Sequence, residues 1–301
     1  MRLGGVRSAR STYLRYTTWR EWVLLFNMKT KIALIGLGRW GKVLLEELKK
    51  QAEVKYECDS KTDLVTVFSD PEVQAVFIAT PTNTHFDIAS KALEADKHVF
   101  LEKPGTTDSN DLEKLVRKAE EKNLKLAIGY EFPHHSAAKK LRELLKSKKM
   151  KNMFFEWHKW GTFNDDAVMH LLCHEISIAK SLGIELVPVS CKYTKVISNS
   201  DILETAFKHD IKSVINRASP IKQKTLTVLT LEGGYIWNND DLFEINTETR
   251  VLDKIDLPET TPVAEEISDF LSAIKENREP KTDGQFALEI YKIIEKVSAL
   301  R

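Results

Sequence analysis

The sequence predicts an α/β protein with two domains: an N-terminal Rossmann domain on a parallel sheet, then an α+β domain on a mostly antiparallel sheet. Short apolar runs alternate with amphipathic stretches from residue 31 to residue 128, as in βαβ units. A glycine-rich turn, Gly36 to Gly41, follows the first run. From residue 187 to 256, segments rich in Val, Ile and Thr alternate with turn signals, which is typical of antiparallel strands.

The first half has its strands in a regular order. We expect strands at 31–35, 53–58, 75–79, 99–101 and 124–128. Between them we expect helices at 85–95 and 108–122, and one after the glycines, where Leu44, Leu45 and Leu48 recur at helical spacing. Continuous apolar runs indicate strands that are buried on both faces. These elements define a Rossmann domain over residues 28–129.

The pattern changes after residue 130. We expect a helix at 136–148, a strand at 152–159 and a helix at 167–182. Residues 225–231 alternate polar and apolar side chains, as in a sheet with one wet face. Helices at 263–276 and 285–300 close the chain. Residues 130–301 are therefore assigned to one α+β domain.

Composition and charge narrow the class of protein. The 301 residues have a formal net charge of +1, so no overall field favours nucleic acid or an anionic membrane. Cysteine is sparse, and its spacing gives neither a disulfide framework nor a zinc pair, which favours a reducing compartment such as the cytoplasm. No apolar run approaches the roughly 18–20 residues that cross a bilayer, so we expect no membrane span.

The first 27 residues differ from the rest and are left out of the fold prediction. Their basic residues are Arg2, Arg7, Arg10, Arg15 and Arg20, against one acid, Glu21. An Arg-rich, acid-poor stretch resembles an organelle transit peptide. Alternatively, Met28 is the true start and the stretch derives from a misplaced start codon. We favour the second interpretation, because Met28 stands directly before the first predicted strand.

The turn Gly36-Leu-Gly38-Arg39-Trp40-Gly41 lies between a predicted strand and a predicted helix. In a dinucleotide fingerprint the first glycine permits the tight turn, the second lets the backbone approach a pyrophosphate, and the third lets helix and strand pack closely. The helix N-terminus then presents free N–H groups to the phosphates. This context predicts NAD or NADP binding.

Asp59 ends the second predicted strand, near the spacing expected for an acid that holds the adenosine ribose. A carboxylate there accepts hydrogen bonds from both ribose hydroxyls and repels a 2′-phosphate, which favours NAD. Lys61 nearby is a cation that would suit NADP, so the preference for NAD is not exclusive.

Two further turns follow predicted strands, at the sheet edge where open α/β sheets bind ligands. One is Thr80-Pro81-Thr-Asn83-Thr-His85, and the other is Glu102-Lys103-Pro104. Lys103 is placed to bind a substrate hydroxyl and help move its proton while hydride passes to or from a nicotinamide. The residues expected at the cofactor are Gly36, Gly38, Arg39, Trp40, Gly41, Asp59, Thr80, Pro81, Asn83, His85, Glu102 and Lys103.

These motifs together resemble the glucose–fructose oxidoreductase/inositol dehydrogenase (Gfo/Idh/MocA) family. Its C-terminal signature is similar to residues 265–270 and 278–284, so the resemblance extends over residues 30–300. It implies a Rossmann domain, a substrate domain whose open sheet forms a homo-oligomer interface, and a catalytic lysine at Lys103. It also implies a cis peptide before Pro104.

The family's second catalytic element is an Asp-x-x-x-His on a helix. Alignment through Leu182-Gly183 puts the family histidine at His174 and its aspartate position at His170. A frame with His170 as the histidine, four residues after Asp166, remains open, although we prefer His174. A spacing of four puts both side chains on one helix face, so we expect both at the catalytic site.

Two other interpretations of this histidine pair remain open, a purely structural role and a helical zinc site with Cys173 or Glu175. Zinc proteases place Glu directly after the first His, where this chain has Leu171, and no third ligand follows from the spacing. We therefore expect no metal.

We expect Tyr130 and Trp160 to contact substrate together with Lys103, His170 and His174. Tyr130 begins the segment that enters the second domain, and Trp160 belongs to an aromatic pair that suits a sugar ring, although paired tryptophans also serve packing. The predicted activity is NAD(P)-dependent oxidoreduction of a secondary alcohol or ketone in a sugar, polyol or sugar nucleotide. The alternative is a dinucleotide-binding sensor or assembly protein with little turnover, because His170 stands where the family has an acid.

Overall fold

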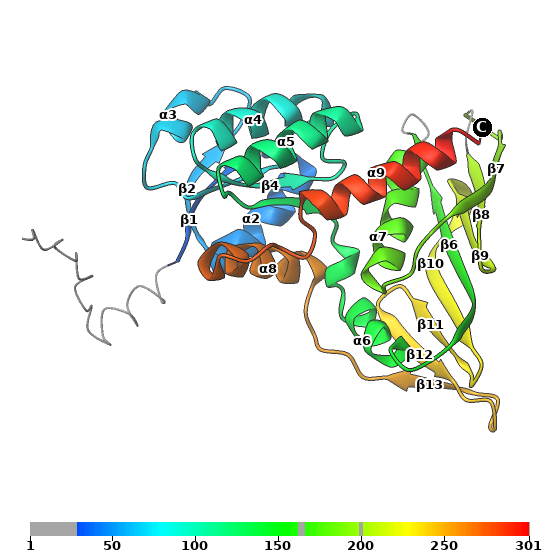
Figure 1. Cartoon of the computed structure of the whole chain (residues 1–301). Coiled ribbons are helices and arrows are strands. Elements are labelled where there is room, and N and C mark those ends of the chain that lie inside the picture. The colour runs from blue at the N-terminus through cyan, green and yellow to red at the C-terminus, as the bar shows by residue number, and fades with distance from the viewer. Residues whose placement is uncertain (1–28, 162–165, 199–200, 301) are drawn as a thin grey trace, which may run out of the picture.

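The computed structural model describes residues 29–161, 166–198 and 201–300, so the predicted leader lies outside the described residues. Two α/β parts lie side by side, each with its own sheet (Figure 1). The first sheet is parallel and the second is mostly antiparallel, which confirms the predicted fold class.

The first sheet has the strand order β2-β1-β3-β4-β5, with every neighbour parallel. Strands β3 and β5 are buried at every residue, as expected of strands covered on both faces. The strands are β1 (Lys31–Ile35), β2 (Glu53–Cys58), β3 (Ala75–Ile78), β4 (His98–Glu102) and β5 (Leu126–Gly129). The helices between them are α2 (Arg39–Gln51), α3 (Leu64–Ser69), α4 (His85–Glu94) and α5 (Ser109–Glu121).

Local sequence explains where these helices begin. The side chain of Asp108 accepts a hydrogen bond from Asp111 N at 3.0 Å and caps α5. Asp63 caps α3 in the same way, through Val65 N at 3.0 Å. The short helix α3 is an addition to the predicted elements, because six residues carry too little periodicity to reveal a helix.

Helix α8 (Pro262–Glu276) lies late in the chain but packs on the first sheet next to α2 (Figure 1). Its Phe270 meets Phe77 and Phe100 edge-on, with ring centroids 5.4 and 5.7 Å apart. The side chain of Thr261 accepts from Ala264 N at 3.1 Å and caps its start. The core of the first domain thus includes a helix from beyond the boundary at residue 130.

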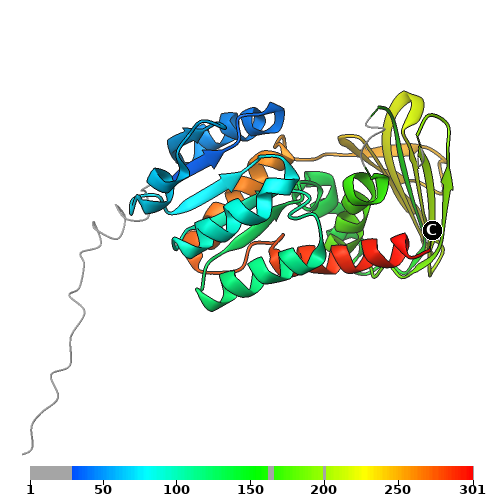
Figure 2. The ribbon, with the colours of Figure 1, turned by 90° about the horizontal axis from the view of Figure 1, so that it is seen from above.

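The second sheet has the order β13-β12-β11-β10-β6-β9-β8-β7, antiparallel except for the β6–β9 pair. Its strands are β6 (Met150–Trp160), β7 (Pro188–Thr194), β8 (Ile202–Phe207), β9 (Ile211–Asn216), β10 (Ala218–Thr230), β11 (Gly234–Asn238), β12 (Asp241–Ile245) and β13 (Leu252–Ile255). Helices α6 (Ser136–Leu145), α7 (Cys173–Ser181) and α9 (Gly284–Ser298) accompany it. Figure 2 shows α7 and α9 between this sheet and the first domain.

The helix predicted over 167–182 is not regular. Val168–Leu172 forms a π turn that leads into α7. Asp166 begins it, because its side chain accepts hydrogen bonds from Val168 N at 2.8 Å and Met169 N at 3.1 Å. A π turn takes more residues per turn than an α-helix, so simple α-helical spacing does not describe this stretch.

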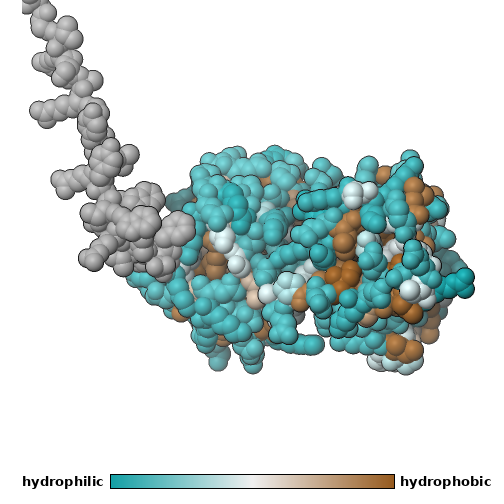
Figure 3. All heavy atoms as spheres, turned by 90° about the horizontal axis from the view of Figure 1, so that it is seen from below, coloured by the Kyte–Doolittle hydropathy of each residue, from teal (hydrophilic) through white to brown (hydrophobic). Residues whose placement is uncertain are grey.

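The outer face of the second sheet carries apolar side chains. On β10, Ile221 and Leu229 are exposed, whereas Leu226 and Val228 are buried. In Figure 3 brown apolar surface gathers mainly over this domain. Among the described residues, no helix combines the length and apolarity needed to cross a membrane.

Candidate active site

The glycine turn has the geometry that a dinucleotide requires. Gly36 has φ +101°, and a Cβ there would lie 2.5 Å from Ala79 O. A Cβ on Gly41 would lie 1.9 Å from Gly36 O, so helix α2 can approach the turn only with glycine. Apart from its chain neighbours, no described residue has an atom within 4 Å of a Cβ on Gly38, the N-cap of α2. The turn therefore leaves open space and free helix N–H groups for a pyrophosphate.

Asp59 lies at the end of β2, beside the same turn, because Gly36 N donates a hydrogen bond to Cys58 O at 2.9 Å. Its side chain is exposed, and Oδ1 accepts from Lys61 N at 2.9 Å and Thr62 Oγ1 at 3.1 Å. These hydrogen bonds, that of Lys61 first, hold the pKa of Asp59 below its usual range, so the carboxylate is charged at neutral pH.

The Thr80–His85 turn contains a 3-10 segment (Thr82–Thr84) that leads into α4. Its His85 ring is buried and connects two turns, since Nε2 lies 2.8 Å from Thr80 O and Nδ1 lies 3.1 Å from Pro104 O. Burial lowers the pKa of His85. We interpret His85 as the residue that ties this turn to the one at Pro104, while Pro81 and Asn83 are exposed.

The Lys103–Pro104 peptide is cis, as the family resemblance implied. Glu102 before it is buried at the end of β4, where its carboxyl accepts hydrogen bonds from the Trp40 indole and from Lys103 N, the latter at 3.2 Å. Burial raises the pKa of Glu102 to about 8. Through these hydrogen bonds Glu102 joins the glycine turn at Trp40 to the turn at Lys103 and Pro104.

A cleft of about 350 Å³ opens at these turns. It brings together six of the residues predicted from sequence, namely Trp40, Thr80, His85, Glu102, Lys103 and His174. Ala79, Thr82, Gly129 and Glu131 complete its lining. The first domain supplies most of the lining, and Glu131 and His174 are the lining residues from the second domain.

His174 is buried at the start of α7. Its ring meets Phe132 edge-on at 5.0 Å and Trp157 at 5.1 Å between centroids. Nδ1 is enclosed and has no hydrogen-bond partner among the described residues, which leaves Nε2 as the nitrogen that can face a ligand. Burial, then the charge of Lys103, lowers the pKa of His174 well below its usual value. The imidazole is therefore neutral at neutral pH.

His170 contributes its main chain. Lys103 Nζ donates a hydrogen bond to the His170 carbonyl oxygen at 3.4 Å, across the boundary between the domains. The His170 side chain is half-buried in the π turn, and its charge bears on His174. Asp166, the acid of the alternative alignment, caps this turn through its side chain.

Two predicted substrate residues lie away from the cleft lining. Tyr130 is fully buried after β5, its ring 6.2 Å from that of Phe286, and its hydroxyl has no partner among the described residues. Trp160 is 63% exposed at the end of β6. Within the part of the chain that the structure describes, no three His, Cys, Asp or Glu side chains are arranged to hold a metal ion.

Comparison with known proteins supports the same assignment. Residues 45–130 match the family described as "Oxidoreductase family, NAD-binding Rossmann fold". A UDP-N-acetylglucosamine 3-dehydrogenase from Acidithiobacillus ferrooxidans is 27% identical over 299 residues, which cover 86% of this chain and 93% of that enzyme. Residues 45–130 thus match the Rossmann part of the Gfo/Idh/MocA oxidoreductases, and the full-length relative is similar over both domains. Members of this family bind NAD or NADP, and the open glycine turn fits such a cofactor.

Other Gfo/Idh/MocA relatives act on nucleotide-linked sugars by name. A dTDP-3,4-didehydro-2,6-dideoxy-alpha-D-glucose 3-reductase from Saccharopolyspora spinosa is 40% identical over 93 residues, 31% of this chain and 28% of that enzyme. The crystal structure of the Acidithiobacillus dehydrogenase aligns with a TM-score of 0.79 and 21% identity over 90% of this chain and 97% of that one. A 3-ketoreductase from Actinomadura kijaniata, solved with TDP-benzene and NADP, aligns with a TM-score of 0.77 and 16% identity over 90% of this chain and 97% of that one.

Two residues near His174, Glu131 and Lys224, are not among the site residues predicted from the sequence. Glu131 lines the cleft, and Lys224 on β10 extends its charge toward His174. Glu131 follows Tyr130 directly, and nothing in its local sequence distinguishes it from a solvated acid. Lys224 had a usable signal, since it falls in phase with buried Leu226 and Val228 on a strand of period two. A lysine on the buried face of a strand needs an explanation.

Proposed function

We propose that this chain catalyses NAD(P)-dependent interconversion of a secondary alcohol and a ketone in a sugar, polyol or sugar nucleotide. The observation that carries the proposal is that Lys103 and His174, from different domains, line one cleft beside the open glycine turn. The names of the relatives support a carbohydrate substrate.

A bound nicotinamide dinucleotide would supply or accept the hydride. The glycine turn would hold its pyrophosphate, and Asp59 its adenosine ribose, which favours NAD over NADP. Lys103, held by the His170 carbonyl, would donate a hydrogen bond to the substrate oxygen and stabilise negative charge on it. His174, neutral through burial, would accept the hydroxyl proton during oxidation and return it during reduction.

The apolar outer face of the second sheet supports the expected homo-oligomer, because exposed apolar patches mark interaction surfaces. The expected cytoplasmic location rests on cysteine usage alone.

The test is turnover on a panel of sugars, polyols and nucleotide sugars, alongside fluorescence titration of NADH. Lys103→Ala is expected to lower kcat by at least about a hundredfold while NADH affinity is retained. The matched control is Lys91→Ala, which removes an exposed lysine of α4 and leaves kcat unchanged. Cofactor binding without turnover on any panel member would contradict the proposal and favour the sensor alternative.

A further inference from the structure

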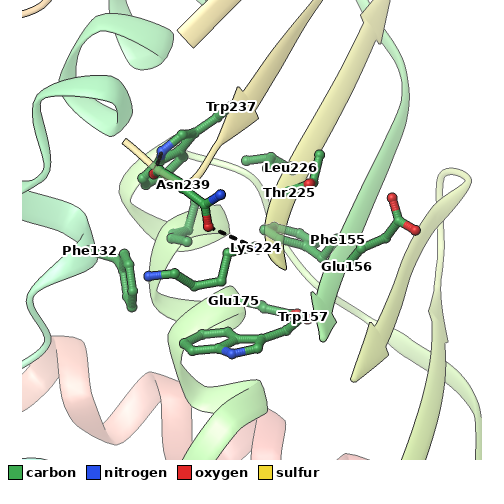
Figure 4. Close-up of a pocket in the computed structure, with 11 residues that line it drawn as sticks. Phe132, Phe155, Glu156, Trp157, Glu175, Lys224, Thr225, Leu226, Trp237 and Asn239 are labelled. Carbon is green, nitrogen blue, oxygen red and sulfur yellow. Dashed lines mark hydrogen bonds between the residues drawn. The ribbon is translucent and has the colours of Figure 1, made fainter. Parts of the chain in front are cut away.

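Lys224 has an unusual environment for a lysine. Its Nζ lies 4.3 Å from the centroid of the Phe132 ring and 5.2 Å from that of Trp157. Figure 4 shows the side chain extending toward Phe132, with the Trp157 ring beside it. Aromatic faces attract a cation, but they accept no conventional hydrogen bond.

The sheet register explains this position. Lys224 pairs with Trp157 across β10 and β6, as Leu226 pairs with Phe155. These pairs share the face that packs toward α7, because side chains alternate along a strand. Lys224 therefore stands where an apolar side chain would continue the core. A hollow of about 30 Å³ beside it is lined by Phe132, Trp157 and Glu175, among others.

The ammonium has no complete set of protein partners. Lys224 donates a hydrogen bond to Asn239 Oδ1 through its main-chain N, but among the described residues no oxygen accepts from its Nζ and no carboxylate pairs with it. Burial lowers the pKa of Lys224, and the charges of Glu131 and Asp240 oppose that shift. A partly buried ammonium with three donors and no acceptor has unused capacity for an anionic ligand.

The surrounding charge points the same way. Lys103, Lys224, His170 and Lys159 each lower the pKa of His174, so basic side chains surround the centre of the cleft. Two acids lie nearby: burial raises the pKa of Glu102 to about 8 and raises that of Glu131, and the charges of Lys224 and Lys103 oppose the shift at Glu131. The region around His174 is therefore suited to a negative group.

We infer that Lys224 binds an anionic group of the substrate, a phosphate or a carboxylate, so that the substrate is a charged sugar derivative and not a neutral sugar or polyol. This inference rests on the proposed function and narrows its substrate class. The hollow of about 30 Å³ beside Lys224 is close to the larger cleft, because Phe132 and Trp157, which line it, pack on His174. The ring would lie in the larger cleft at Lys103 and His174, with its anionic substituent toward Lys224.

The experiment measures ligand binding, independently of turnover. Enzyme saturated with NADH is titrated by calorimetry with UDP as the phosphate probe and galacturonate as the carboxylate probe. Lys224→Met keeps the length of the side chain over the rings and removes the charge. This variant is expected to bind the recognised probe at least about tenfold more weakly than the wild type, whereas its affinity for NADH should be unchanged. Lys224→Arg should retain most of the binding.

The matched control is Lys222→Met, which removes an exposed lysine two residues away on the same strand. It should leave both probes unaffected. The probe that depends on Lys224 identifies the source of the anion, a nucleotide sugar or a sugar acid. Added salt should weaken the binding of that probe more in the wild type than in Lys224→Met, because salt screens the charge of Lys224.

Three results would overturn the inference. The first is that neither probe binds the wild type at millimolar concentration. The second is that Lys224→Met binds both probes as tightly as the wild type does. The third is that Lys222→Met loses as much affinity as Lys224→Met. The proposed function would survive any of these if turnover still depended on Lys103. If Lys224→Met still turned over neutral sugars, the substrate would be a neutral sugar or polyol.

Discussion

Lys103 Nζ donates a hydrogen bond to the main-chain carbonyl of His170, at 3.4 Å. The sequence predicts instead that this part of the helix acts through the His170 side chain, at the position where the family has an acid. A carbonyl oxygen is a neutral acceptor that can orient an ammonium without adding a full negative charge. The contact also depends on the π turn, which sets where this carbonyl points.

A first prediction separates the two histidines. His170→Ala keeps the carbonyl that contacts Lys103, so kcat should fall by no more than about tenfold. His174→Asn removes the proposed proton acceptor, and kcat should fall by at least about a hundredfold. Steady-state kinetics with a substrate identified from the panel measures both, and NADH titration with thermal unfolding checks that the variants are folded. Equal losses in the two variants would show that the side chain of His170 also acts in the chemistry.

The glycine turn provides a second prediction, because two of its glycines are needed for different reasons. A methyl group on Gly41 would collide with Gly36 O, so Gly41→Ala should reduce the free energy of unfolding by about 1–3 kcal/mol. A methyl group on Gly38 meets no atom of the described structure within 4 Å beyond its chain neighbours, so Gly38→Ala should keep stability and weaken NADH binding. Urea unfolding and fluorescence titration separate these effects. Unchanged NADH affinity in Gly38→Ala would show that the pyrophosphate lies elsewhere.

Elements with strong local signals could be predicted from the sequence. The strand at 53–58 has the predicted bounds, and the glycine turn links β1 to α2 as its spacing indicated. Glu102, Lys103 and His174 meet in one cleft because all three follow recognisable motifs. These features depend on short stretches of chain whose backbone geometry is set by a few residues.

Other features depend on contacts between distant segments. Helix α8 has an ordinary amphipathic pattern that does not reveal which sheet it covers, and only packing with Phe77 and Phe100 joins it to the first domain. Tyr130 follows a strand whose side-chain direction depends on the fold of both domains. The π turn likewise arises from long-range packing, since no motif in Val168–Leu172 distinguishes it from an α-helix.

Cofactor choice gives a third prediction. Asp59→Asn keeps an oxygen that can accept from Lys61 N and removes the charge that repels a 2′-phosphate. The ratio of NADP to NAD affinity should therefore rise, by about tenfold. Titrations with NADH and NADPH give the ratio directly. Asp63→Asn, which changes the exposed cap of α3, is the control and should leave it unaltered. If Asp59→Asn leaves the affinity ratio as unchanged as Asp63→Asn does, the Asp59 carboxylate does not contact the adenosine ribose.

The last prediction concerns stability in acid. Burial lowers the pKa of His98 from 6.5 to about 4, and its Nδ1 accepts a hydrogen bond from Lys125 N at 2.9 Å, which requires that nitrogen to be unprotonated. The unfolded chain therefore binds a proton at His98 as pH falls below 6.5, whereas in the native chain His98 stays unprotonated until about pH 4. The contribution of unprotonated His98 to the free energy of unfolding is complete above pH 6.5, and it decreases as pH falls from 6.5 to about 4. The slope from this residue is at most about 1.4 kcal/mol per pH unit.

His98→Asn retains an acceptor for Lys125 N but does not titrate, so its unfolding free energy should fall less steeply between pH 6.5 and about 4 than that of the wild type. Urea unfolding followed by circular dichroism at several pH values measures the two slopes. His209→Asn is the matched control, because His209 is exposed and has φ +61°, a conformation that asparagine tolerates. It should reproduce the wild-type slope. Parallel curves for His98→Asn and the wild type would mean that His98 takes up a proton equally in the folded and unfolded chains, which the Lys125 hydrogen bond does not allow.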